Sequence, residues 1–193
     1  MFAMGDKMRK NQINENLERF RELVLYISQK CANDPRFGAT KLNKILYFSD
    51  FVCYAHYGQP LTGVEYQRLP NGPAPRRLLP IREEMQQEGS LGIQEVPLRN
   101  GRMQVRTVNL RQPNLDIFSA KEIALVDSVI EALSNETAQG VSDLSHNMVG
   151  WKVARDQENI PYTTVFLSDA PLNDIDIQRG REVAKEFDLV AQA

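Results

Sequence analysis

The segment from Lys41 to Tyr57 constrains the fold most strongly, because it has helical spacing and carries apolar residues on more than one side. Leucine and isoleucine form one stripe, and the aromatic residues that occupy the other sides are Tyr47, Phe48, Phe51, Tyr54 and Tyr57. A helix that is apolar nearly all round is normally enclosed by its neighbours. We therefore predict a central helix over residues 41–57, capped by Thr40 and ended by Gly58 in a left-handed conformation.

Other helices are predicted on both sides of this segment. Apolar spacing predicts one amphipathic helix over about residues 11–31 and another after Pro75 that ends near residue 89, with a kink or restart at Pro80. The stretch Ser119-Ala-Lys-Glu122 is a capping box that opens a further helix. Ser142 is expected to cap a helix running to about residue 155, and Asp174 a final one.

The β signal is confined to one part of the chain. Residues 91–98 and 103–110 flank Asn100-Gly101, which is the strongest short turn signal for a β-hairpin. Pro97 places the first of these strands at an edge, because proline cannot donate to a strand ladder. Residues 163–167 are also expected to be extended.

Length and composition fit a single globular domain. The chain has 193 residues, of which 42% are hydrophobic and 25% are charged. We expect a flexible N-terminus over residues 1–10 and one domain over residues 11–190. The predicted fold class is mostly α (α+β): a single-domain helical bundle around a central apolar helix, with a small antiparallel β-hairpin.

The net charge and the two cysteines limit the range of possible functions. A net charge of −2 and a pI near 5.8 argue against a general nucleic-acid binder. No apolar run approaches the roughly 20 residues of a membrane span, so we predict a cytoplasmic protein without a membrane partner. Cys31 and Cys53 show no paired-cysteine motif and are expected to be buried thiols in a reducing compartment.

The residue patterns predict no catalytic, metal or cofactor site. Gly58, Gly63 and Gly72 match neither the Walker A spacing nor the dinucleotide fingerprint, because a helix precedes their loop. His56 and His146 lack further metal ligands in a recognisable pattern. The protein is therefore predicted not to be an enzyme and to need no cofactor.

Two alternatives from other classes stay open. One is a hydrolase-like role centred on His146, in which Asp143 or His56 would take part. The other is a DNA-binding regulator, although no helix with a basic face stands out.

The surface chemistry of the glycine- and proline-rich segment is open to two interpretations. Lys41, Lys44, Arg76 and Arg77 are either solvated residues or a positive rim that steers a partner. The tyrosines of this region are either core residues with hydrated tips or part of a protein interface.

At these residues the sequence resembles the Panacea domain family, also described as SocA-like antitoxin or phage-associated proteins. The similar stretches are "KLNKILYF", then "GQPLTG", then the corner from Tyr66 to Pro75, and downstream "LSHNMVGW". The resemblance spans about residues 23–165. The positions that carry the motif and have an expected structural role are Leu46, Phe48, Gly58, Pro60, Gly63, His146 and Trp151.

The resemblance implies an antitoxin-type protein that neutralises a toxin encoded nearby by direct contact, or that acts as an adaptor for a ClpXP-type protease. It implies no catalytic residue. We expect this corner to be rigid and to contact the cognate toxin. The candidate partner-binding residues are Lys44, Tyr47, Tyr66, Gly72, Pro73, Pro75 and Arg76. Rigid loops lose little entropy on docking.

Overall fold

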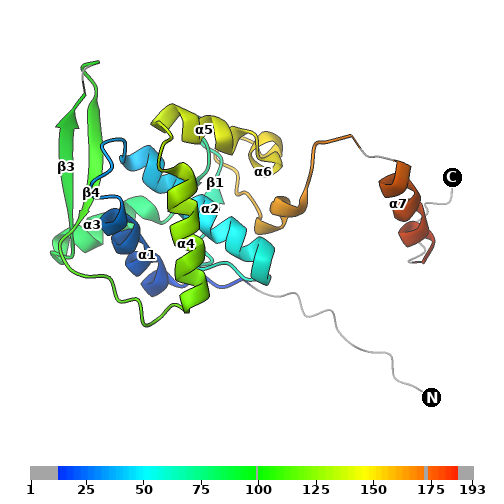
Figure 1. The fold of residues 1–193 in the computed structure, drawn as a ribbon, viewed down its shortest axis with the longest axis horizontal. Helices are drawn as coiled ribbons and strands as arrows, with labels where there is room; N and C mark the ends of the chain where they lie inside the picture. Colours follow the sequence, from blue (N-terminus) through cyan, green and yellow to red (C-terminus); the bar gives the residue numbers. More distant parts are fainter. Residues whose placement is uncertain (1–12, 99, 172–173, 187–193) are drawn as a thin grey trace.

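The computed structural model describes residues 13–98, 100–171 and 174–186 and shows a bundle of helices with two small antiparallel sheets (Figure 1). The helices are α1 (Leu17–Lys30), α2 (Ala39–Tyr57), α3 (Leu78–Gln87), α4 (Ala120–Leu133), α5 (Ala138–His146), α6 (Val149–Val153), the 3₁₀ helix η1 (Tyr162–Phe166) and α7 (Asp174–Glu186). The strands are β1 (Tyr66–Gln67), β2 (Ala74–Pro75), β3 (Leu91–Pro97) and β4 (Met103–Asn109). The predicted fold class is confirmed. The flexible N-terminus predicted over residues 1–10 lies outside the described residues.

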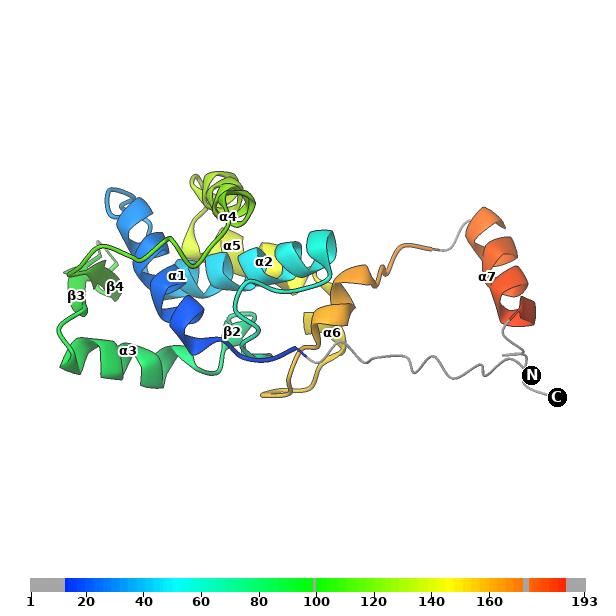
Figure 2. The same cartoon turned by 90° about the horizontal axis from the view of Figure 1, so that it is seen from below.

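Helix α2 lies at the centre, in contact with α1, α4, α5, β2 and η1 (Figures 1 and 2). Its buried residues occur on all sides, as predicted for a central helix. Gly58 ends it in the left-handed conformation, which is also confirmed. The prediction of Thr40 as the cap is wrong: the N-cap is Gly38, which makes no side-chain cap, and Thr40 is the second helical residue.

Helix α1 begins later than its apolar spacing predicts. Asn16 caps it by accepting a hydrogen bond from the Arg19 N–H (3.0 Å). The backbone N–H of Asn16 donates to the Thr62 carbonyl (2.7 Å), which ties the chain before the helix to the loop after α2. This long-range bond explains why residues 13–16 are not helical although Ile13 continues the apolar spacing.

The predicted hairpin is confirmed in its strands and in its turn. Leu91 pairs with Asn109 and Pro97 with Met103. Gly101 adopts a positive φ of 77° at the turn. The second sheet, β1–β2, was not predicted, because its strands of two residues each are too short to show an alternating pattern.

The region from Ser142 onward differs from the single helix predicted there. Thr137 caps α5 by accepting from the Gly140 N–H (3.0 Å), so Ser142 lies inside this helix. The chain becomes extended at Met148 before α6 begins. The break brings α6 against the η1 region, where a Cβ on Gly150 would lie 2.3 Å from Thr164 Oγ1.

Two further local predictions are wrong for identifiable reasons. Pro80 is the third residue of α3, so its missing N–H falls in the first turn, where no intrahelical partner exists and no kink is needed. Residues 163–167 are not extended, because most of them belong to η1. Tyr162 anchors η1 by donating its hydroxyl to the Val64 carbonyl (2.7 Å).

The remaining described features concern the cysteines, membrane spans and metals. Cys31 and Cys53 are buried free thiols, as predicted. In the described part of the chain, no helix is both long and apolar enough to cross a membrane. Nor do these residues include a group of three or more His, Cys, Asp or Glu side chains suited to hold a metal ion.

Helix α7 stands away from the bundle (Figures 1 and 2).

The capping box of α4 gives a stability prediction. Ser119 Oγ and the Ser119 N–H both bond Glu122, whose carboxylate also pairs with Arg19. We expect Ser119→Ala to lower the free energy of unfolding by about 1 kcal/mol in urea denaturation, because a cap is lost. Ser128→Ala on the same helix is the control and should change stability by less than about 0.5 kcal/mol. Equal losses for the two variants would contradict the capping role.

Candidate functional site at the proline corner

The corner from Tyr66 to Pro75 is positioned by charged side chains that α2 buries. Asp50 is fully buried and accepts three hydrogen bonds: from the Thr62 N–H (2.7 Å), the Thr62 hydroxyl (2.5 Å) and the Tyr66 hydroxyl (2.8 Å). Burial raises the pKa of Asp50, and these hydrogen bonds oppose that rise. Asp50 therefore fixes the start of the corner to the middle of α2.

Lys44 holds the far end of the corner. Its side chain is 1% exposed, and its Nζ donates to the Pro73 carbonyl (2.8 Å). No carboxylate pairs with it among the described residues. Burial without a counter-charge lowers the pKa of the Lys44 ammonium to about 7. Lys44 thus stabilises the corner from inside by bonding its backbone.

Lys41 is buried to the same degree and supports a different loop. Its Nζ bonds Asp34 (2.6 Å) and the carbonyls of Ser134 (2.9 Å) and Glu136 (3.1 Å). Both interpretations, solvated residues and a positive rim, are therefore wrong for Lys41 and Lys44, because each is 1% exposed. Arg76 and Arg77 are the exposed cations of that group.

The turn of the corner lies directly over Lys44 and α5. Gly72 has a φ of +93°, and a Cβ at this position would lie 2.3 Å from Ser145 Oγ and 2.7 Å from Lys44 Nζ. Only glycine meets both conditions, the left-handed backbone and the close approach. Ser142 Oγ also donates to the Asn71 carbonyl (3.1 Å).

The downstream motif completes the site. Trp151 donates its ring N–H to the Leu69 carbonyl (3.1 Å). The His146 ring stacks on Trp151 with a centroid distance of 3.9 Å, and the Arg68 guanidinium lies 4.3 Å from the Trp151 ring centroid. Desolvation, and then the neighbouring Lys44 charge, lower the pKa of His146. The structure therefore packs the two separate sequence motifs against each other.

The predicted partner-binding residues divide sharply by exposure. Six of them are buried: Lys44, Tyr47, Tyr66, Gly72, Pro73 and Pro75. Arg76 is exposed. In this structure the six buried residues support the corner from behind, and Arg76 is the member of the set that is exposed.

The residues predicted to have a structural role differ in how far they are buried. Leu46 and Gly63 are buried, Phe48, Pro60, His146 and Trp151 are half-buried, and Gly58 is exposed at the end of α2. Both interpretations of the tyrosines, core and interface, find examples. Tyr47 and Tyr66 belong to the aromatic core with Phe51 and Tyr162. Tyr57, by contrast, is 53% exposed.

The accessible part of the site was largely missed by sequence reasoning. We call it the corner surface and define it by these exposed or half-buried residues: Arg68, Pro70, Asn71, Arg76, His146 and Trp151. Arg76 is held in place by hydrogen bonds to Gln67, Gln157 and Asn159. The position of Arg68 within the corner could have suggested its role, but its contact with Trp151 is visible only in the fold.

Gly72 gives a test of the packing between the two motifs. Gly72→Ala should lower the free energy of unfolding by about 3 kcal/mol, through left-handed strain and collision with Ser145 and Lys44. The matched control is Gly101→Ala, which has a similar φ of +77° but open space around the new methyl group, and it should cost only about 1 kcal/mol. Similar losses in urea denaturation would show that the contact at Gly72 is loose.

Lys44 gives a prediction of pH dependence. The folded state holds its pKa at about 7 and the ordinary value is 10.5, so between these values the folded state binds fewer protons than the unfolded state. Stability from this group must then rise as pH increases from 7 to 10. The change should be on the order of a few kcal/mol, since one pKa unit corresponds to about 1.4 kcal/mol.

Urea denaturation of the Lys44→Met variant across this pH range measures the effect. The variant should lose the rise in stability, whereas Lys121→Met, on an exposed lysine of α4, should keep it. A Lys44→Met variant with the wild-type pH profile would contradict the assignment.

Comparison with known proteins adds one match. The family model described as Antitoxin SocA-like, Panacea domain, matches residues 42–152, more than half of the chain. No curated protein and no solved structure is significantly similar to the chain. The matched region runs from α2 to α6 and contains the whole corner together with the motif around His146 and Trp151. The chain therefore belongs to the SocA-like antitoxin family and carries its Panacea domain.

Proposed function

We propose that this protein is an antitoxin that binds a cognate toxin, encoded nearby, and neutralises it by direct contact. The observation that carries the proposal is the family match across α2–α6, the region in which the two motifs form one packed corner. We place the complex in the cytoplasm of a bacterial or phage-carrying cell.

The corner surface is the proposed contact with the toxin. Its side chains include Trp151 and two arginines, residue types that are enriched at the energetic centres of protein interfaces. Arg68 and His146 pack against Trp151, so the ring is already oriented before a partner arrives. Lys44 and Trp151 both bond backbone carbonyls of the corner, and this preorganisation limits the entropy lost on binding.

The local geometry at His146 favours binding over the hydrolase-like alternative. Ser145 donates its hydroxyl to the Ser142 carbonyl (2.7 Å) and not to an imidazole nitrogen. His146 stacks on Trp151, and its buried Nε2 makes no hydrogen bond with the described residues. Neighbouring residues arranged in this way do not form a nucleophile–base pair, which needs a hydrogen bond between the two side chains.

Co-expression with the product of the adjacent reading frame tests the function. The toxin alone should stop growth, and the wild-type chain should restore it. Asn71→Arg should abolish rescue, because it places a long charged side chain on the exposed tip of the corner while leaving the Asn71 carbonyl free to bond Ser142. Gln86→Arg introduces the same side chain on the exposed face of α3, outside the corner surface, and should rescue normally.

The same assay separates the possible modes of action. Rescue that persists in a host without ClpXP indicates direct neutralisation, and rescue that is lost there indicates delivery to the protease. If the wild-type chain neither binds nor rescues, the antitoxin proposal is wrong. If Asn71→Arg and Gln86→Arg rescue equally while both proteins bind the toxin, the contact lies on another surface.

A further inference from the structure

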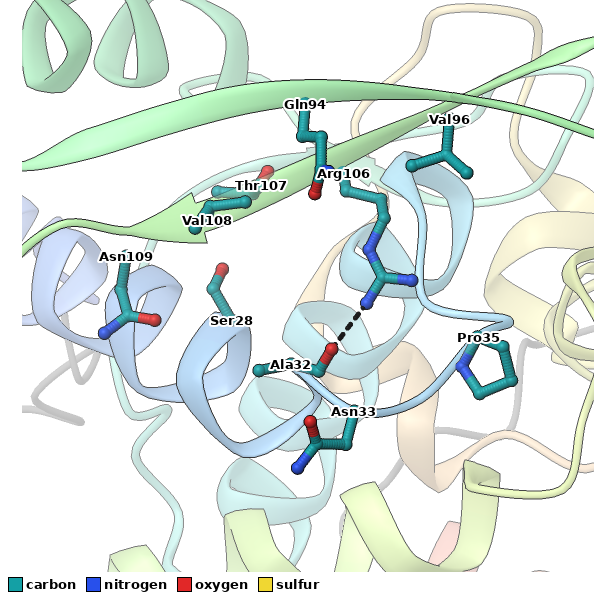
Figure 3. A pocket seen from close by; sticks show the side chains of 10 residues that line it. All are labelled: Ser28, Ala32, Asn33, Pro35, Gln94, Val96, Arg106, Thr107, Val108 and Asn109. Atoms are coloured by element: carbon teal, nitrogen blue, oxygen red, sulfur yellow. Dashed lines mark hydrogen bonds between the residues drawn. The ribbon is translucent and has the colours of Figure 1, made fainter.

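A cavity of about 410 Å³ lies between the β-hairpin and the C-terminal end of α1, away from the proline corner (Figure 3). Its floor is formed by Ser28 of α1 and by the loop residues Ala32, Asn33 and Pro35. Its volume lies within the range of roughly 300–1,000 Å³ that is typical of small-ligand sites. The residues that line this cavity include none of the corner surface.

Strand register explains which side chains form the roof. Gln94 pairs with Arg106, and Gly92 pairs with Val108, so the alternate residues Gln94, Val96, Arg106 and Val108 leave the same face of the hairpin. Figure 3 shows Gln94, Val96 and Arg106 directed toward the floor. Glu95 leaves the opposite face and is not among the residues that line the cavity.

The floor contains a buried polar group without a partner. Ser28 is 1% exposed, and its hydroxyl makes no hydrogen bond with any described residue. The hydroxyl points from α1 toward the hairpin (Figure 3). A buried hydroxyl without a partner is destabilising, so an acceptor atom of a ligand that bonded Ser28 would be favourable.

Arg106 supplies charge to the same space. One of its terminal nitrogens donates to the Ala32 carbonyl (2.8 Å), which fixes the guanidinium across the cavity (Figure 3). A guanidinium has five N–H donors, so others remain available. None of the described carboxylates forms an ion pair with Arg106, and the nearby Asp34 is engaged by Lys41 (2.6 Å) and by the Arg36 N–H (2.8 Å).

The residues that line the cavity together favour a ligand with a negative charge. Arg106 is the one ionisable side chain among the ten described residues that line the cavity. A planar carboxylate matches the geometry of a guanidinium, and its second oxygen can accept from a hydroxyl. Val96, Val108 and Pro35 offer apolar surface to a short hydrocarbon chain.

We propose that this cavity binds an aliphatic carboxylate, with Arg106 and Ser28 as the two donors. The carboxylate belongs either to a free small acid or to an aspartate or glutamate side chain of a bound protein. This inference does not rest on the antitoxin role.

Titration of the full ¹⁵N-labelled chain with butyrate, followed by amide NMR shifts, tests the proposal. Butyrate should cause saturable shifts centred on the cavity, and the neutral isostere butyramide should bind at least tenfold more weakly. Arg106→Gln keeps hydrogen-bond donors but removes the charge and should weaken butyrate binding at least tenfold. Arg102→Gln, on the same hairpin but outside the cavity lining, should bind as the wild type does.

Ser28→Ala provides a second variant that does not depend on charge. It should weaken butyrate binding while keeping or raising the melting temperature of the free protein, because an unpaired buried hydroxyl is removed. Absence of saturable shifts, or equal butyrate affinity in Arg106→Gln and the wild type, would overturn the proposal. Equal affinity in Ser28→Ala would overturn the assignment of the second donor.

Competition identifies the source of the carboxylate once butyrate binding is established. If butyrate weakens toxin binding and Arg106→Gln does so too, the natural carboxylate is a side chain of the partner. If toxin binding is unaffected by both, the natural ligand is a free acid. Failure of the antitoxin role would leave the butyrate titration unchanged, so the two proposals fail separately.

Discussion

Charged side chains buried on α2 hold the surrounding loops in place. A helix enclosed on all sides has no solvent face for its charges, and a buried charge without polar partners is strongly destabilising. Lys41, Lys44 and Asp50 therefore each require partners from another segment. Lys41 bonds Asp34 and a carbonyl of the chain after α4, and Lys44 bonds the Pro73 carbonyl. Asp50 accepts hydrogen bonds from Thr62 and Tyr66. Three charges on one helix thus decide where three loops are placed.

The same arrangement explains why the proline corner is rigid. Its carbonyls at Leu69, Asn71 and Pro73 are bonded by side chains from α6, α5 and α2 respectively. Backbone groups that are all satisfied by side chains of the bundle leave little freedom for the turn. A turn fixed in this way presents a constant outer surface, and this is the property that a protein-binding site needs in order to bind without a large loss of entropy.

The two proposed sites use different parts of the fold. The corner surface is built on side chains that the bundle already holds in hydrogen bonds and ring stacks, such as Trp151. The hairpin cavity, by contrast, leaves the Ser28 hydroxyl without a partner and uses Arg106 only in part. The first is therefore largely preformed in the free protein, whereas the proposed role of the second depends on hydrogen bonds from Ser28 and Arg106 to a ligand.

Local sequence patterns were enough to predict the features that depend on near neighbours. These are the central α2 from its all-round apolar spacing, the hairpin from Asn100-Gly101, and the α4 cap from Ser119 and Glu122. Membership of the antitoxin family also followed from local motifs. Which motif residues are accessible depends instead on how distant segments pack together. The partner of Lys44 is 29 residues away and that of Trp151 is 82 residues away, and no local pattern records such a pairing. Burial, the break before α6 and the cavity under the hairpin all arise from contacts of this kind, because they depend on which distant segments the bundle brings together.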